Sequence, residues 1–229
     1  MWKTALRSSR LLAALALCAA CGQASRADDS FSQAEQLLLL GDHLSNVSQK
    51  TVINYAYHKS GTLDAASDGK VNLIVSAMPQ GSGKHTHVDF LSGERKFELP
   101  DINDASSNPV ILFFLERDVR DMERRTGGKA TYFRKRVRMA LAESAQVQPI
   151  QFDFNGRSVN GTQITLHPFT DDPLKSRFEK LADKTYVFTL SQEVPGQLYR
   201  MQTQARAPQA ETDALPLLEE TVTFTGAEP

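Results

Sequence analysis

The sequence predicts an α+β fold, in which a curved antiparallel β-sheet carries an inserted helical hairpin and one further short helix. Apolar and polar residues alternate in short runs over residues 51–99 and 146–225, which is the period of half-buried strands. Between these stretches, at about residues 108–145, the apolar period becomes helical. Strands and helices that are segregated along a chain in this way are typical of helices packed on an antiparallel sheet.

Residues 1–27 have the composition of a bacterial export signal. Lys3, Arg7 and Arg10 form a basic start without acidic residues, and residues 11–20 are an unbroken run of leucine, alanine and one cysteine. This run is shorter than the roughly 20 apolar residues that a permanent transmembrane helix needs. We therefore expect a cleaved signal, followed by a single β-rich globular domain at residues 28–229.

Two cleavage routes remain open. Small residues before Ala24 and Ala27 suit the ordinary signal peptidase, which would release a free periplasmic protein. The segment at residues 17–22 instead resembles the lipobox of bacterial lipoproteins, although Cys18 stands where that pattern usually has leucine. Cleavage after Ala20 would make Cys21 the lipidated N-terminus and anchor the domain to the outer membrane. N-terminal acylation is the only membrane association that we expect.

Charge and cysteine content exclude several classes of function. Removing residues 1–27 takes away four basic residues and no acid, so that 22 basic residues face 27 acidic ones and the net charge becomes about −5. An acidic domain is unsuited to nucleic acid, which requires clustered basic residues. Cys18 and Cys21 are the only cysteines, so the domain beyond the export segment has no disulfide, thiolate metal site or thiol redox chemistry.

The mature chain is expected to begin with a short helix and a meander of strands. Ser32 and Glu35 form a capping-box pattern ahead of the leucines at residues 37–40, and Gly41 ends the helix. Alternating runs then predict strands at residues 51–57, 71–77, 86–90 and 96–99.

The helical hairpin is predicted to begin at Asn108-Pro109, because proline is tolerated at the first helical position and asparagine caps it. Residues 126–128, Thr-Gly-Gly, separate the two arms. The short apolar run at residues 110–115 cannot be distinguished from a buried strand by periodicity alone.

Strands return after the hairpin. Asn155-Gly156 predicts a tight turn between strands at residues 150–154 and 164–166. Asp172-Pro173 is expected to cap a third helix that continues to Leu181. Further strands are predicted at residues 186–190, 198–205 and 220–225.

Alternate residues of one strand present a candidate metal site. His85, His87 and Asp89 would point to the same side, and zinc or a similar divalent metal is held by such nitrogen and oxygen ligands. The alternative is that these residues form the solvent face of a strand whose other face, Thr86 and Val88, packs inward.

No catalytic motif is present. The glycine-rich residues 81–84 fail as a phosphate loop, because Met78 replaces the first glycine and His85 replaces the required serine or threonine. The chain also lacks the nucleophile elbow, the zinc-protease helix motif and the dinucleotide fingerprint. We therefore expect a non-enzymatic protein without a cofactor.

The hairpin carries a basic strip on its second arm. The first arm balances its charges through pairs four residues apart: Glu116–Arg120, Arg117–Asp121 and Asp121–Arg125. On the second arm only Glu143 faces five basic residues: Lys129, Arg134, Lys135, Arg136 and Arg138. This strip could contact lipid phosphates, an acidic partner or an anionic polymer. The alternative is a solvated face whose charges are balanced by acidic residues elsewhere on the fold.

The hairpin also carries a family resemblance. Residues 108–120, with Thr126-Gly127-Gly128 and Tyr132-Phe133-Arg134, resemble uncharacterised exported proteins of proteobacteria, a family that implies no activity. The order of a helix, a meander, inserted helices and more strands is similar to the periplasmic lipoprotein-carrier fold. That fold implies an incomplete barrel around an apolar cavity.

The leading hypothesis is a non-enzymatic cell-envelope protein that binds a lipid-like apolar ligand or a protein partner in the periplasm. As a carrier, it would hold acyl chains between the sheet and the hairpin against four apolar side chains: Phe114, Leu115, Phe133 and Val137. Arg134 and Arg138 would lie near the headgroups. An interaction module would fill that space with side chains. The alternative is a metal-dependent enzyme or metal-binding protein that uses His85, His87 and Asp89.

Overall fold

The computed structural model of the chain describes residues 31–78, 80, 83–207 and 214–229. The predicted export signal, its cleavage positions and Cys21 lie outside these residues.

On strand β1 (Thr51–Ser60), Ile53, Tyr55 and Tyr57 are at most 1% exposed, whereas Ala56 and His58 are exposed. The predicted alternation thus puts one face of this strand in the core.

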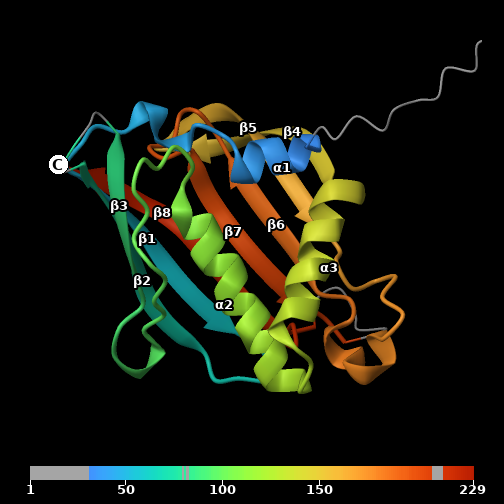
Figure 1. Cartoon of the computed structure of the whole chain (residues 1–229). Helices are drawn as coiled ribbons and strands as arrows, with labels where there is room; N and C mark the ends of the chain where they lie inside the picture. The colour runs from blue at the N-terminus through green and yellow to red at the C-terminus, as the bar shows by residue number, and fades with distance from the viewer. Residues whose placement is uncertain (1–30, 79, 81–82, 208–213) are drawn as a thin grey trace, which may run out of the picture. The chain divides into compact units, whose positions relative to one another are not determined.

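Eight strands form one antiparallel sheet within the described residues, in the order β3-β2-β1-β8-β7-β6-β5-β4. The other strands are β2 (Ser67–Ala77), β3 (Lys84–Phe90), β4 (Gln146–Phe154), β5 (Arg157–Leu166), β6 (Thr185–Leu190), β7 (Leu198–Ala205) and β8 (Leu218–Glu228). The sheet is curved and does not close, because β3 and β4 remain as its two edges (Figure 1). The predicted α+β fold with a curved antiparallel sheet is confirmed.

The edge strand β3 is partly covered by the chain that follows it. Thr86 bridges Ile102 and Phe90 bridges Phe97 through isolated antiparallel contacts. The strand predicted at residues 96–99 is therefore reduced to the bridge at Phe97.

The three α-helices of the described residues lie on one face of the sheet (Figure 1). Helix α1 (Gln33–Leu39) begins with the predicted capping box, and the Ser32 hydroxyl also donates to the Leu141 carbonyl at 2.8 Å. The inserted hairpin consists of α2 (Pro109–Thr126) and α3 (Ala130–Glu143), as predicted. Asn108 caps α2 by accepting from the Val110 amide at 3.1 Å. None of the helices in the described part of the chain is long and apolar enough to cross a membrane.

The segment predicted as a third helix forms two short 3-10 turns instead, η3 (Lys175–Arg177) and η4 (Glu179–Leu181). The buried Asp172 carboxylate accepts from the Leu174 amide at 2.7 Å and from the Tyr132 hydroxyl at 2.5 Å, which holds the start of the segment against α3. Phe178 then turns inward, with its ring 5.7 Å from the ring of Phe133. These two anchors stop the segment from continuing as a regular helix.

Candidate functional site

All four apolar residues predicted to line a ligand cavity are packed in the core. Phe114, Leu115, Phe133 and Val137 are 1%, 8%, 1% and 4% exposed, and they belong to one cluster with the inward side chains of the strands. In this structure, side chains therefore occupy the space around these residues. Phe133 differs from the other three because it also lines a surface pocket.

This pocket lies at the turn between α2 and α3 and has a volume of about 700 Å³. We call it the turn pocket. Its apolar lining comes from α3 and from the segment before η4: Tyr132, Phe133, Leu174 and Phe178. Its basic lining consists of Lys129, Lys135 and Arg177, all of them exposed. Pockets of this volume are typical of small-molecule sites.

The turn itself follows from local sequence. Gly127 has a φ of 69°, the left-handed conformation that ends many helices, and its amide donates to the Glu123 carbonyl. A Cβ on Gly128 would lie 2.8 Å from a ring carbon of Phe133, so only glycine lets this ring pack against the turn. The Glu123 carboxylate accepts from the Ala130 amide at 3.0 Å and thereby caps α3.

An aromatic cluster supports the wall of the turn pocket. The ring of Phe133 lies 5.8 Å from Phe169 and 5.6 Å from Tyr132, both edge to face. Burial, together with the neighbouring Asp172 carboxylate, raises the pKa of Tyr132 to about 12. The Tyr132 hydroxyl is therefore protonated at neutral pH and donates to Asp172.

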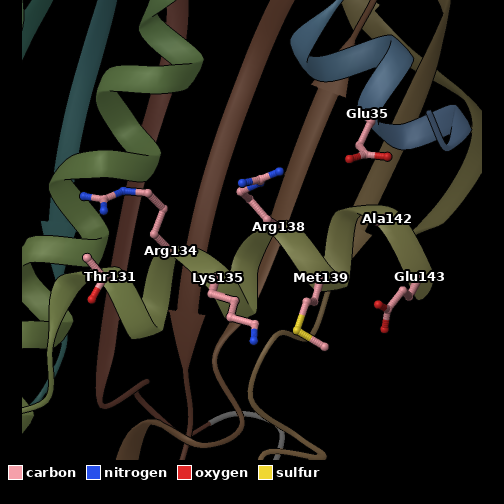
Figure 2. A pocket seen from close by; sticks show the side chains of 8 residues that line it. All are labelled: Glu35, Thr131, Arg134, Lys135, Arg138, Met139, Ala142 and Glu143. Atoms are coloured by element: carbon pink, nitrogen blue, oxygen red, sulfur yellow. The ribbon is translucent and has the colours of Figure 1, made fainter. Parts of the chain in front are cut away.

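The predicted headgroup residues Arg134 and Arg138 lie at a different pocket, on α3 and beside α1, with a volume of about 430 Å³ (Figure 2). Arg134 extends toward α2 and forms two hydrogen bonds with Glu116, at 2.7 and 3.0 Å. Arg136 pairs with Asp172 at 3.0 Å. Two residues of the basic strip thus form ion pairs with acids elsewhere on the fold. Lys129, Lys135 and Arg138 form no ion pair within the described residues.

The first arm of the hairpin differs from the predicted pairing at one position. Asp121 pairs with Arg125 at 2.5 Å and Glu116 with Arg120 at 3.3 Å, as predicted. Arg117 instead pairs with Glu220 of β8. The prediction considered only neighbours four residues apart and could not include a strand about a hundred residues away.

His85, His87 and Asp89 lie on the same side of β3, while Thr86 and Val88 are 1% and 6% exposed on the other side. The strand face was therefore predicted correctly. Asp101 approaches both imidazoles, with its carboxylate 2.6 Å from Nδ1 of His87 and 3.3 Å from Nε2 of His85. In the part of the chain that the structure describes, no group of three or more such residues is arranged to hold a metal ion.

Comparison with known proteins gives fold-level similarity alone. No family model and no curated protein matches the chain. The lipoprotein LppX of Mycobacterium tuberculosis has 10% identity and a TM-score of 0.32, over 76% of this chain and 84% of that chain. LprF of Mycobacterium bovis has 11% identity and a TM-score of 0.30, over 86% and 94%. A LolA superfamily protein of Nitrosomonas europaea has 8% identity and a TM-score of 0.25, over 85% and 92%. At these scores the similarity carries no conclusion about function.

Proposed function

We propose that this chain is a non-enzymatic cell-envelope protein that binds a lipid-like anionic amphiphile, with the apolar part of the ligand in the turn pocket. The observation that supports the proposal is an apolar wall beside basic side chains that form no ion pair with the acids of the described residues. The export signal predicted at residues 1–27 would deliver the protein to the periplasm, either free or anchored through Cys21.

The apolar wall favours a ligand with an acyl chain. Leu174 is 37% exposed at the pocket, and Phe133 and Phe178 lie behind it in the core cluster. Each methylene that leaves water at such a surface contributes about 0.8 kcal/mol to binding. A long acyl chain, with many methylenes against this wall, should therefore bind more tightly than a short one.

The basic lining favours an anionic headgroup. Lys129, Lys135 and Arg177 form no ion pair within the described residues, in contrast to Arg134 and Arg136 of the same region. Guanidinium and ammonium groups form strong charge-assisted hydrogen bonds with carboxylate or phosphate oxygens. An acidic headgroup at the mouth of the pocket would supply the missing counter-charge.

The sequence-based hypothesis that acyl chains lie deeper, between the sheet and the hairpin, stays a prediction. It would require Phe114, Leu115 and Val137 to leave a well-packed core. Opening a cavity of that size in a core costs several kcal/mol, on the order of the cost of large-to-small core substitutions. The turn pocket needs no such rearrangement. In both versions Phe133 contacts the ligand.

Binding of a fluorescent fatty acid and of the neutral alcohol with the same chain tests the proposal. We expect Leu174→Asp and Arg177→Glu each to weaken fatty-acid binding about tenfold, equivalent to about 1.4 kcal/mol. The alcohol should lose affinity with Leu174→Asp but not with Arg177→Glu. Arg157→Glu, at the start of β5, is the matched charge control and should leave both affinities unchanged.

Two results would overturn this assignment. If Arg138→Glu weakens fatty-acid binding and Arg177→Glu does not, the headgroup lies at the α3 pocket of Figure 2 and not at the turn pocket. If native mass spectrometry of protein purified from a bacterial envelope never detects retained lipid, the ligand class itself is wrong.

The alternative function, metal binding at His85, His87 and Asp89, stays a prediction. The approach of Asp101 to both imidazoles offers a fourth oxygen ligand, although the present arrangement is not one that holds a metal ion. Elemental analysis of the purified protein decides it, because no more than a substoichiometric trace of zinc or another divalent metal would reject the idea.

A further inference from the structure

A second pocket concentrates positive charge between α2 and the β1–β2 end of the sheet. It has a volume of about 480 Å³, and we call it the flank pocket. Its charged lining comes from β1, from the segment after β3 and from successive turns of α2. The cations are Lys59, Arg95, Arg117, Arg120 and Arg124. Their convergence from three distant parts of the chain distinguishes the flank pocket from an ordinary charged helix face.

The acids in the flank pocket do not balance these cations. Asp64 and Asp121 line it, and Glu220 lies behind it, 2% exposed and paired with Lys59 and Arg117. Arg125 joins the network by bridging Asp64 and Asp121. Six cations therefore face three acids, a formal excess of three positive charges on a chain whose formal net charge is −1. Glu116 does not change the balance, because it pairs with both Arg120 and Arg134.

The guanidinium groups are held in defined orientations. The guanidinium carbon of Arg117 lies 5.1 Å from the centre of the Tyr57 ring, and that of Arg120 lies 5.1 Å from the centre of the Phe97 ring. Stacking on a ring leaves the N–H groups at the edge of the guanidinium plane available to an oxyanion. Among the residues that the structure describes, Arg95 donates to the backbone carbonyl of Asp68, at 2.7 Å, and forms no ion pair with a carboxylate.

Tyr57 also lines the flank pocket, and its hydroxyl lies buried behind the pocket wall. Tyr57 is 1% exposed, and its hydroxyl, which is close to Glu220 and Arg117, forms no hydrogen bond of ordinary geometry in the described structure. Burial raises the pKa of Tyr57, so the hydroxyl keeps its proton. A buried hydroxyl without a well-aligned acceptor is unfavourable, and a small shift toward an oxyanion in the flank pocket would give it one.

We propose that the flank pocket is a binding site for a soluble phosphate monoester, held by Arg95, Arg117, Arg120, Lys59 and the Tyr57 hydroxyl. The charge excess favours a dianion over a singly charged anion. The volume of about 480 Å³ exceeds what inorganic phosphate alone would occupy, which leaves room for a small polar body on the ester oxygen. This site is independent of the turn pocket and of the amphiphile proposed to occupy it.

Calorimetric titration with glycerol 3-phosphate and with inorganic phosphate, at constant ionic strength, tests the site. Arg95 and Arg120 have exposed side chains and few structural contacts, so the double change Arg95→Gln with Arg120→Gln should leave the fold intact. We expect it to weaken binding of both probes about tenfold or more. Arg157→Gln, the matched control, and Leu174→Asp, in the turn pocket, should leave both affinities unchanged.

Tyr57→Phe separates binding from structure. Because the hydroxyl forms no well-aligned hydrogen bond in the described residues, its removal should change the unfolding temperature little, whereas it should weaken glycerol 3-phosphate binding by about fivefold. Unchanged affinity in this variant would overturn the role of the hydroxyl. The whole site would be overturned if the wild type bound neither soluble probe, including the case in which it bound only vesicles of phosphatidylglycerol, a singly charged diester.

Discussion

The most demanding prediction concerns a buried ion pair that fixes α2 to the sheet. Asp118 of α2 and Lys184, just before β6, are 2% and 1% exposed and hydrogen-bonded to each other. The second carboxylate oxygen of Asp118 accepts from the hydroxyl of the fully buried Tyr186. Removing one partner of such a pair leaves an uncompensated buried charge, which costs about 3–5 kcal/mol. Lys184→Met should therefore destabilise the protein by that amount.

The same reasoning predicts rescue by a second substitution. Asp118→Leu combined with Lys184→Met replaces the pair with apolar groups of similar size, and such replacements are often neutral or stabilising by about 1–4 kcal/mol. The buried Tyr186 hydroxyl then loses its acceptor, at a cost of about 1–3 kcal/mol, so the double variant should be more stable than either single variant without exceeding the wild type by much. Urea denaturation of the wild type, both single variants and the double variant measures the coupling. In thermal unfolding, each single variant should lose roughly 10 °C.

The reasoning would be refuted if the single variants cost less than about 1 kcal/mol, which is the range of solvent-exposed pairs. It would also fail if the double variant were as unstable as the sum of the two single variants, since that result means no coupling. Either result would indicate that water reaches the pair, and that α2 is not fixed where the flank pocket requires it.

Three further predictions follow from the contacts described above. Gly128→Ala would place a Cβ 2.8 Å from the Phe133 ring, so we expect a loss of about 1–3 kcal/mol in denaturation and weaker fatty-acid binding. Burial lowers the pKa of His43 below its ordinary 6.5. The contribution of the neutral His43 to stability should therefore be complete above pH 6.5 and lost as the pH falls through the folded-state pKa. Urea denaturation of the wild type and His43→Gln over this pH range measures it. The hydrogen bond with Asp101 raises the pKa of His87 above 6.5. The small contribution of the protonated His87 to the stability of the fold should therefore be complete below pH 6.5 and lost as the pH rises through the raised pKa. An NMR titration in which Asp101→Asn leaves that pKa unchanged would contradict this cause.

Local signals in the sequence determined the regular elements of this fold. The Ser32–Glu35 capping box and the Asn108 cap act within three residues, and Gly127 ends α2 because it adopts a left-handed conformation. Alternation is likewise a property of neighbouring residues, and it correctly placed Tyr55 and Tyr57 of β1 in the core. These predictions succeeded because each depends on contacts or conformations close in the sequence.

The tertiary structure alone decided where charged and functional side chains meet. Arg117 pairs with Glu220 rather than with Asp121, and the partner of Arg134 is Glu116 of the other helix. The segment after Asp172 forms 3-10 turns in place of the predicted helix, because burial of this carboxylate and of Phe178 outweighs helix propensity.

Both proposed pockets arise in the same way. The flank pocket joins Lys59, Arg95 and Arg117, which share no sequence motif, and the turn pocket joins Arg177 to the first turns of α3. Composition and periodicity specify which faces are apolar, but they carry no information about which distant segments the sheet order brings together. Here the antiparallel β1–β8 pairing places Glu220 beside Lys59 and so decides the position of the buried acid around which the cations of the flank pocket assemble.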